Sequence, residues 1–295
     1  MSANDPRFAA SIEATPKQIL EGDDLAGLFP AGTSVYLTDL GIDDTPRMVA
    51  AARRVADLGY NPVPHLASRR YASVEAFEAR IRGFAGEAGV GDVLVIGGEA
   101  DRAGCFASSM ELLETGILDA HGIRRIGVAG HPEGNPAIPE GAVREALSWK
   151  KAFAERTGAE MRIVTQFGFD APGIIAWADR LEADGFDLPV HIGIAGPAKV
   201  TTLIKYAAIC GVGASLKFLK KRAGALAALA TVYTPDGVVQ ALESEYAGSG
   251  RGPIAQMHIF PFGGLRRASE WLYERGSWSR EDISAVPFDK IEARI

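Results

Sequence analysis

The sequence has few of the features that mark metal-binding, secreted or membrane proteins. Its 295 residues include only two cysteines, Cys105 and Cys210, which lie far apart and have neither disulfide nor zinc spacing. We expect both to be buried thiols in a reducing cytoplasm. The first residues show no basic and apolar signal pattern, and no apolar run is long enough to span a bilayer. We therefore predict a cytoplasmic protein with no membrane association.

An excess of positive charge is also missing. The formal net charge is −6, because 37 acidic residues outnumber 31 lysines and arginines. A nucleic-acid-binding domain is expected to show the opposite sign, so we predict no nucleic-acid partner. One local basic run, 217–222, is typical of a solvated helix face. The sequence leaves the oligomeric state open, a homo-oligomer included.

What the chain does contain is a repeated alternation of apolar runs and helical stretches. Apolar runs rich in β-branched residues occur at 8–14, 34–39, 62–67, 92–98, 125–131, 161–167, 190–196 and 256–263. Helix-start signals lie between several of them, as at 44–46, 139–140 and 170–172. Eight such units predict an α/β fold, a (β/α)8 TIM barrel formed by residues 1–295 as a single domain. Extra helices at 200–210, 214–230 and 235–246, within about 197–248, are predicted between the last two strands.

In barrels of this kind, functional side chains lie at the carboxyl ends of the strands. This rule selects Glu13, Thr38, Asp39, His65, Glu99, His131, Glu133, Gln166, Asp170 and the turn at 261–264. Glu13 interrupts an otherwise apolar strand. We therefore expect burial to raise the pKa of its carboxyl group and to suit it to general acid catalysis near neutral pH. A core ion pair is the structural alternative.

A metal centre is not predicted. The histidines that lie on or beside strands are His65, His131, His191 and His258, and none has the paired spacing of a zinc site. Glycines at 97–98 and 127–130 would let the backbone approach a flat or phosphorylated ligand closely, or they form tight turns. Neither pair is followed by dinucleotide-binding or P-loop spacing.

Four short motifs follow one another along nearly the whole chain. Residues 11–16 read Ser-Ile-Glu-Ala-Thr-Pro, residues 64–66 Pro-His-Leu, residues 126–136 Ile-Gly-Val-Ala-Gly-His-Pro-Glu-Gly-Asn-Pro, and residues 163–170 Ile-Val-Thr-Gln-Phe-Gly-Phe-Asp. In this order they resemble the motifs of the methylenetetrahydrofolate reductases, flavin-dependent (β/α)8 barrels of one-carbon metabolism. The resemblance implies an oxidoreductase that interconverts 5,10-methylenetetrahydrofolate and 5-methyltetrahydrofolate, with FAD as cofactor and NAD(P)H as hydride donor.

The resemblance also implies roles for individual residues. Glu13 matches the catalytic glutamate that supplies a proton when the imidazolidine ring of the folate opens. Gln166 matches a glutamine that hydrogen-bonds the pterin, and Glu99 falls where the family has an aspartate near flavin and pterin. These three would be catalytic, and together with Phe169 they would bind the folate. The positions implied for the cofactor are Thr38, His65, Gly97, Gly98, Glu99, His131, Asn135 and Lys151.

Some positions differ from the family pattern. Gly97 stands where the family has a flavin-binding arginine, and His131 and Asn135 replace a tyrosine and a histidine. Additional residues also separate the region around Lys151 from Gln166. Two alternatives therefore stay open. One is a flavin-free folate-dependent one-carbon enzyme, and the other is a folate-binding barrel without reductase activity.

Overall fold

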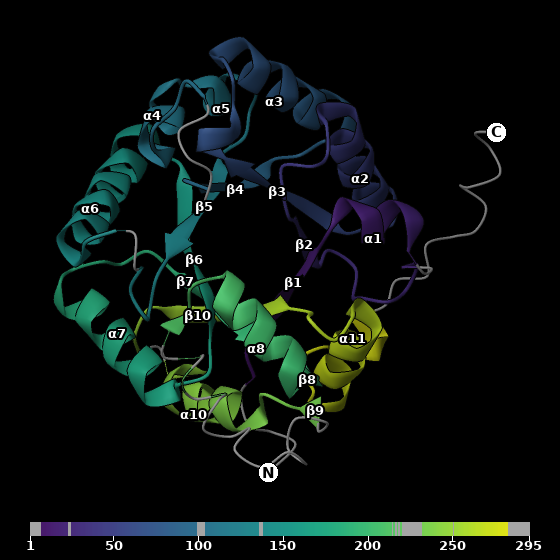
Figure 1. Ribbon diagram of the computed structural model, residues 1–295, viewed down its shortest axis with the longest axis vertical. Coiled ribbons are helices and arrows are strands. Elements are labelled where there is room, and N and C mark those ends of the chain that lie inside the picture. Colours follow the sequence, from purple (N-terminus) through teal and green to yellow (C-terminus); the bar gives the residue numbers. More distant parts are fainter. Residues whose placement is uncertain are drawn as a thin grey trace.

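The strands form a closed ring inside a ring of helices (Figure 1). The computed structural model describes residues 7–22, 25–98, 104–135, 138–213, 215, 217, 219, 232–249 and 251–282. The barrel strands are β1 (Ala10–Ala14), β2 (Ser34–Leu37), β3 (Asn61–Ala67), β4 (Asp92–Ile96), β5 (Arg125–Gly130), β6 (Glu160–Gly168), β7 (Val190–Ala195) and β10 (Ile254–Phe260). Their order around the ring is β1-β10-β7-β6-β5-β4-β3-β2, and all neighbours are parallel. The predicted (β/α)8 barrel and its eight strands are confirmed.

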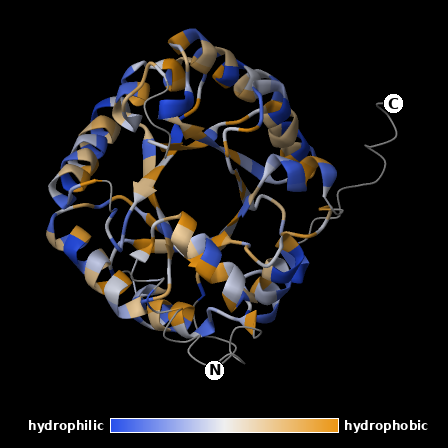
Figure 2. Cartoon of the chain, in the orientation of Figure 1, coloured by the Kyte–Doolittle hydropathy of each residue, from blue (hydrophilic) through white to orange (hydrophobic). Residues whose placement is uncertain are grey.

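Helices lie between successive strands of the barrel, and most of them cover its outside. They are α1 (Pro16–Glu21), α2 (Thr45–Asp57), α3 (Val74–Ala88), α4 (Ser109–Glu114), α5 (Ile117–Ala120), α6 (Glu140–Thr157), α7 (Ala171–Ala183), α8 (Val200–Ile209), α10 (Asp236–Tyr246) and α11 (Leu265–Glu274), with 3-10 turns at Ser68–Arg70 and Arg280–Asp282. Figure 2 shows hydrophilic and hydrophobic residues mixed along these outer helices. This pattern is expected because each outer helix packs one face on the strands and exposes the other.

Three helices begin where the sequence signals predict them. The side chain of Asp44 accepts a hydrogen bond from the backbone of Arg47, and Pro46 occupies the first turn of α2. The helices α6 and α7 begin directly after Pro139 and Asp170. All three predicted start signals are therefore confirmed.

The chain between β7 and β10 holds the predicted extra helices. Two of the three, α8 and α10, are confirmed, and a small antiparallel sheet of β8 (Ala198–Lys199) and β9 (Val232–Tyr233) accompanies them. The predicted middle helix, 214–230, falls almost entirely outside the described residues. Figure 1 shows α8 inside the ring of outer helices, next to β10. This insertion therefore reaches over the barrel rather than around it.

The hydrophobic core lies mainly between strands and helices, and a smaller cluster fills the barrel itself. That inner cluster consists of Tyr36, Val63, Leu94 and Val164. Cys105 and Cys210 are only partly buried, so the expected full burial of both thiols is wrong. Among the described helices, none combines the length and apolar character needed to cross a membrane. The assignment of residues 1–295 to one domain stays a prediction.

Candidate functional site

Glu13 is the penultimate residue of β1, and its side chain is 13% exposed. Its Oε1 lies 3.2 Å from Nε2 of His258 on β10 and 3.6 Å from Nε2 of His65 on β3. Burial raises the pKa of Glu13 to about 7, although the interaction with His65 opposes the rise. The increase in the pKa of Glu13 that the sequence predicts is therefore confirmed. No lysine or arginine of the described residues pairs with Glu13, so the alternative of a core ion pair is not supported.

Both histidines beside Glu13 are uncharged at neutral pH. Burial lowers the pKa of His258 to about 3, and the charge of Arg162 adds to this effect. Burial also lowers the pKa of His65. Among the described residues Glu13 therefore has polar neighbours but no cationic partner, which is the environment in which a carboxyl group keeps its proton.

The hydrogen bonds of His258 indicate where the proton lies. Ser11, two residues before Glu13, donates its hydroxyl proton to the carbonyl of Met257 at 3.3 Å, and its Oγ lies 3.0 Å from Nδ1 of His258. If Ser11 donates to Met257, Nδ1 donates to Ser11 and Nε2 of the neutral ring accepts from a protonated Glu13; in the other tautomer Ser11 donates to Nδ1 and Nε2 donates to Glu13. The raised pKa of Glu13 favours the first arrangement.

The opposite end of the barrel interior is closed by a buried ion pair. Nη2 of Arg162 lies 2.7 Å from Oδ1 of Asp92, and both Nε and Nη2 donate to the hydroxyl of Tyr36, at 3.0 and 2.8 Å. The ring of Tyr36 in turn lies 4.3 Å from that of His258. Polar groups therefore run through the barrel from the ion pair at the amino ends of the strands to Glu13 near the carboxyl ends.

Gln166 lies on β6 near its carboxyl end, at an irregularity of the sheet. The register between β6 and β7 shifts between Val164 and Phe167. Gly193 makes this possible, because a Cβ there would come within 2.5 Å of the carbonyl oxygen of Thr165. The side-chain oxygen of Gln166 accepts from the backbone of Phe167 at 3.1 Å, and its amide nitrogen has no partner among the described residues. Gln166 is half-buried and is a candidate donor for a ligand.

Other predicted cofactor positions follow the ends of neighbouring strands. Thr38 comes directly after β2 and donates to the carbonyl of Ala14, and Gly97 and Gly98 follow β4. His131 follows β5, where burial lowers its pKa and Lys150 adds to the shift. Asn135 lies further along the same loop and pairs with Ile138. Glu99 lies outside the described residues.

Lys151 and Phe169 are the remaining predicted site residues in the described part of the chain. Nζ of Lys151 donates to the carbonyl of Gly185 at 2.8 Å and lies 3.1 Å from Asp187, in the loop that leads into the amino end of β7. Its neighbour Lys150 is buried instead, and burial lowers the pKa of Lys150 to about 8. Phe169 is 2% exposed, so its ring is covered by protein. The structure therefore places Lys151 at the loop before β7, away from the Glu13 group, and packs Phe169 against Tyr233 of β9.

Sequence reasoning missed the importance of Ser11 and His258, because it treated each histidine alone. Two signals could have found them. Ser11 and Glu13 lie two residues apart and so share one face of β1. In a closed barrel the last strand pairs with the first, which places His258 beside Ser11.

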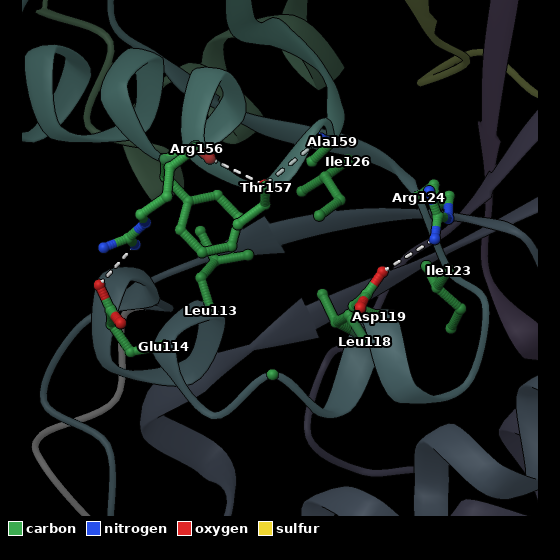
Figure 3. Close-up of a pocket in the computed structure, with 12 residues that line it drawn as sticks. Leu113, Glu114, Leu118, Asp119, Ile123, Arg124, Ile126, Arg156, Thr157 and Ala159 are labelled. Atoms are coloured by element: carbon green, nitrogen blue, oxygen red, sulfur yellow. Dashed lines mark hydrogen bonds and ion pairs between the residues drawn. The ribbon is translucent and has the colours of Figure 1, made fainter.

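A separate cleft of about 340 Å³ lies outside the barrel, at the amino end of β5 (Figure 3). Apolar side chains such as Leu113 and Phe153 line it, and Arg156 pairs with Glu114 at its edge, 2.9 Å apart. None of the predicted site residues lines this cleft. Within the described part of the chain, no group of three or more histidine, cysteine or acidic side chains is arranged to hold a metal ion.

A short part of the chain is similar in sequence to two proteins named methylenetetrahydrofolate reductase. No family model matches. Methylenetetrahydrofolate reductase 1 of Schizosaccharomyces pombe is 39% identical over 69 residues, and methylenetetrahydrofolate reductase 2 of Saccharomyces cerevisiae is 36% identical over 69 residues. The match covers 23% of this chain and 11% of each relative. The chain is therefore a (β/α)8 barrel with partial sequence similarity to these enzymes.

Two solved structures are also similar over most of their length. Dihydropteroate synthase (FolP) from Thermus thermophilus has a TM-score of 0.42 at 14% identity, covering 92% of this chain and 94% of that chain. Dihydropteroate synthase from the same organism in complex with 6HMPPP has a TM-score of 0.43 at 14% identity, covering 91% and 93%.

Proposed function

We propose that this chain is a methylenetetrahydrofolate reductase-like oxidoreductase, with NAD(P)H as hydride donor and Glu13 as general acid. One observation carries the proposal. A carboxyl group that is 13% exposed and has a pKa of about 7 lies near the carboxyl end of a barrel strand, between two neutral imidazoles and with no lysine or arginine paired to it among the described residues. The partial similarity to proteins named methylenetetrahydrofolate reductase supports the choice of substrate. We place this activity in the cytoplasm.

The chemistry requires such an acid. In 5,10-methylenetetrahydrofolate one methylene carbon joins two nitrogens in a five-membered ring. Breaking one carbon–nitrogen bond leaves an iminium ion on one nitrogen and an amine on the other, and that amine takes a proton. Hydride then adds to the iminium carbon to give the methyl group. Glu13 is proposed to supply the proton, since its raised pKa keeps it protonated up to about neutral pH and its Oε1 lies 3.2 Å from Nε2 of His258.

Gln166 is proposed to hold the pterin. Its carboxamide lies near the carboxyl end of β6, and its amide nitrogen is available for a ligand carbonyl or ring nitrogen. The neighbouring bulge, made possible by Gly193, fixes the backbone at this point. A pterin bound there would be oriented by an amide while Glu13 acts on the methylene bridge.

FAD is the proposed cofactor, and the residues assigned to it fit it only in part. Thr38, Gly97 and Gly98 lie at the ends of neighbouring strands. Lys151 points to the other end of β7. We therefore derive no step through the flavin. This placement favours, as a second candidate, a flavin-free enzyme in which hydride passes from nicotinamide to the folate. An absorbance spectrum of the purified protein separates the two, because a bound flavin absorbs visible light.

The test of the proposal is the variant Glu13→Gln, which keeps shape and can still donate to His258 but cannot supply a proton. NAD(P)H oxidation that depends on 5,10-methylenetetrahydrofolate should fall about 10²- to 10⁴-fold. In the wild-type protein the rate should decrease as the pH rises above about 7, since Glu13 then loses its proton. Glu160→Gln, at the exposed start of β6, is the matched control. Unchanged turnover in Glu13→Gln would remove Glu13 from this role, and folate binding without turnover in the wild-type protein would favour a binding barrel.

A second variant tests the pterin contact. Gln166→Ala should weaken the binding of 5-methyltetrahydrofolate more than that of NAD(P)H, because only the folate would lose a hydrogen bond, worth about 0.5–1.5 kcal/mol. Dissociation constants for both ligands, measured by calorimetry, check this expectation. Equal losses for the two ligands would count against a pterin contact.

A further inference from the structure

The imidazole of His65 is buried beside Glu13, yet one of its nitrogens makes no hydrogen bond. His65 is 7% exposed, and its Nε2 is buried with no hydrogen-bond partner among the described residues. This atom lies 3.6 Å from Oε1 of Glu13, which is beyond the range of a hydrogen bond. A buried polar atom left unpaired destabilises a fold, and a role in catalysis is one reason for keeping it.

Neighbouring strands of the barrel hold the ring of His65 in this position. His65 lies on β3, where it pairs with Leu94 of β4. Its ring meets the ring of Tyr36 on β2 edge to face, at 6.1 Å and 79°. Tyr36 is itself fully buried and accepts a hydrogen bond from Arg162. The ring is therefore fixed next to Glu13, and a shift of less than about 1 Å would bring Nε2 within hydrogen-bond range of Oε1.

The other imidazole beside Glu13 is matched to the protonated carboxyl group. Oε1 of Glu13 lies 3.2 Å from Nε2 of His258, and the raised pKa of Glu13 favours the arrangement in which this nitrogen accepts the carboxyl proton. The proton of the neutral ring is then on Nδ1, which donates to Ser11 at 3.0 Å. Nε2 of His258 therefore has no proton to offer once Glu13 is ionised.

We propose that His65 is a positioning residue that stabilises Glu13 after it has given up its proton. The proton goes to the amine that leaves the methylene bridge, and Nε2–H of His65 then closes the 3.6 Å gap and donates to the negative Oε1. Because this donor is unpaired while Glu13 holds its proton, the new hydrogen bond favours proton transfer over the resting state. The catalytic meaning of this bond rests on the proposed function, in which Glu13 is the general acid.

The titratable groups that face His65 agree with a neutral donor. Burial lowers the pKa of His65 and His258 adds to this effect, whereas Glu13 and Asp39 oppose it. The carboxylate of Asp39 is already paired with two arginines. His65 is therefore uncharged at neutral pH. At Glu13, burial raises the pKa and His65 lowers it, which is the direction expected of a neighbour that stabilises the ionised form.

The test measures the pKa of Glu13 in ligand-free, full-length protein. Carbon-13 NMR of labelled glutamate carboxyl groups follows the titration, and the signal that is missing from Glu13→Gln identifies Glu13. His65→Leu removes the donor, so the pKa of Glu13 should rise by about 1 or more, because the carboxylate loses a hydrogen bond. His65→Phe keeps a planar ring but also lacks the donor, and it should give the same rise. His65→Gln retains an N–H donor and should keep the pKa near 7.

A matched control removes another neutral imidazole of the barrel. His191 lies on β7, and its Nδ1 is also buried without a partner in the described part of the chain. Burial lowers the pKa of His191 to about 3, so this ring is uncharged as well. His191→Leu should leave the pKa of Glu13 unchanged. In assays of folate-dependent NAD(P)H oxidation, the pH at which the rate declines should move upward in His65→Leu and stay in place in His65→Gln.

The outcomes separate this inference from the proposed function. An unchanged or lower pKa of Glu13 in His65→Leu or in His65→Phe overturns the inference. A rise of equal size in His65→Gln or in His191→Leu also overturns it, because the effect would then not depend on a donor at this position. A wild-type protein without folate-dependent turnover overturns the proposed function, while the pKa comparison still decides whether His65 stabilises ionised Glu13.

Discussion

Two carboxylates lie inside the same barrel, one at each end, and their surroundings differ. Asp92, the first residue of β4, lies 2.7 Å from Arg162 and 3.6 Å from Arg125. Glu13, near the end of β1, contacts two imidazoles, both neutral at pH 7. Burial raises the pKa of both carboxyl groups, but at Asp92 two guanidinium groups oppose the rise.

The two carboxyl groups therefore differ in the charged groups that surround them. Arg162 on β6 binds Asp92 on β4 and Tyr36 on β2, so a single side chain ties three strands together. In the described part of the chain no lysine or arginine pairs with Glu13, and burial lets it keep its proton until the pH nears 7. Stabilising groups at the amino ends of the strands and reactive groups at the carboxyl ends are the usual division in such barrels.

Removing one partner of the buried Arg162–Asp92 ion pair should have the largest effect on stability. Arg162→Met leaves Asp92 buried without its closest cation and takes two donors from Tyr36. We expect the free energy of unfolding to fall by about 3–5 kcal/mol, the usual cost of removing one partner from a buried pair. Urea denaturation followed by circular dichroism measures this change.

The double variant Arg162→Met with Asp92→Leu is the control for this prediction. It removes both charges, so most of the lost stability should return. A surface pair gives the comparison, since Arg144→Met breaks the exposed contact with Asp184 and should cost less than about 1 kcal/mol. A cost for Arg162→Met as small as that of Arg144→Met would show that the buried pair does not stabilise the barrel.

The raised pKa of Glu13 should make the stability of the folded protein depend on pH. The folded-state pKa of Glu13 is about 7, above its ordinary value of 4.5, so folded protein holds a proton between these values that unfolded protein has released. Wild-type stability should therefore fall as the pH rises from 4.5 to 7, by about 3 kcal/mol in total. Glu13→Gln carries no such proton and should lack this part of the pH dependence.

Denaturation curves at several pH values on either side of this range check the difference. Glu160→Gln, which changes an exposed glutamate at the start of β6, should follow the wild-type protein at every pH. Parallel curves for Glu13→Gln and the wild-type protein would mean that the carboxyl group of Glu13 titrates alike in folded and unfolded chains.

The barrel was predictable because its signals are local and repeated. Each strand is a short apolar run, and helix starts such as Asp44 and Pro46 carry their own capping chemistry. The partial exposure of both cysteines was missed because it depends on how loops pack, and loops have no such period.

The site was predictable only where one residue carries the signal. A glutamate within an apolar strand is expected to be buried, and burial is the main cause of the raised pKa of Glu13. The partnership with His258 depends on barrel closure, which brings residues 245 positions apart into contact. Lys150 and Lys151 show another limit, since one step along a helix turns a side chain by about 100° and decides which lysine is buried.

The smallest predicted effect concerns Arg125, which is the second cation beside Asp92. Arg125 lies 3.6 Å from Oδ2 of Asp92, and its side chain is 50% exposed, whereas that of Arg162 is 10% exposed. Water screens the outer pair, so Arg125→Met should lower the free energy of unfolding by less than about 1 kcal/mol. The same urea titration measures it, with Arg162→Met alongside. If Arg125→Met costs as much as Arg162→Met, then Asp92 depends on both cations equally, and the amino end of the barrel is not sealed from water as burial indicates.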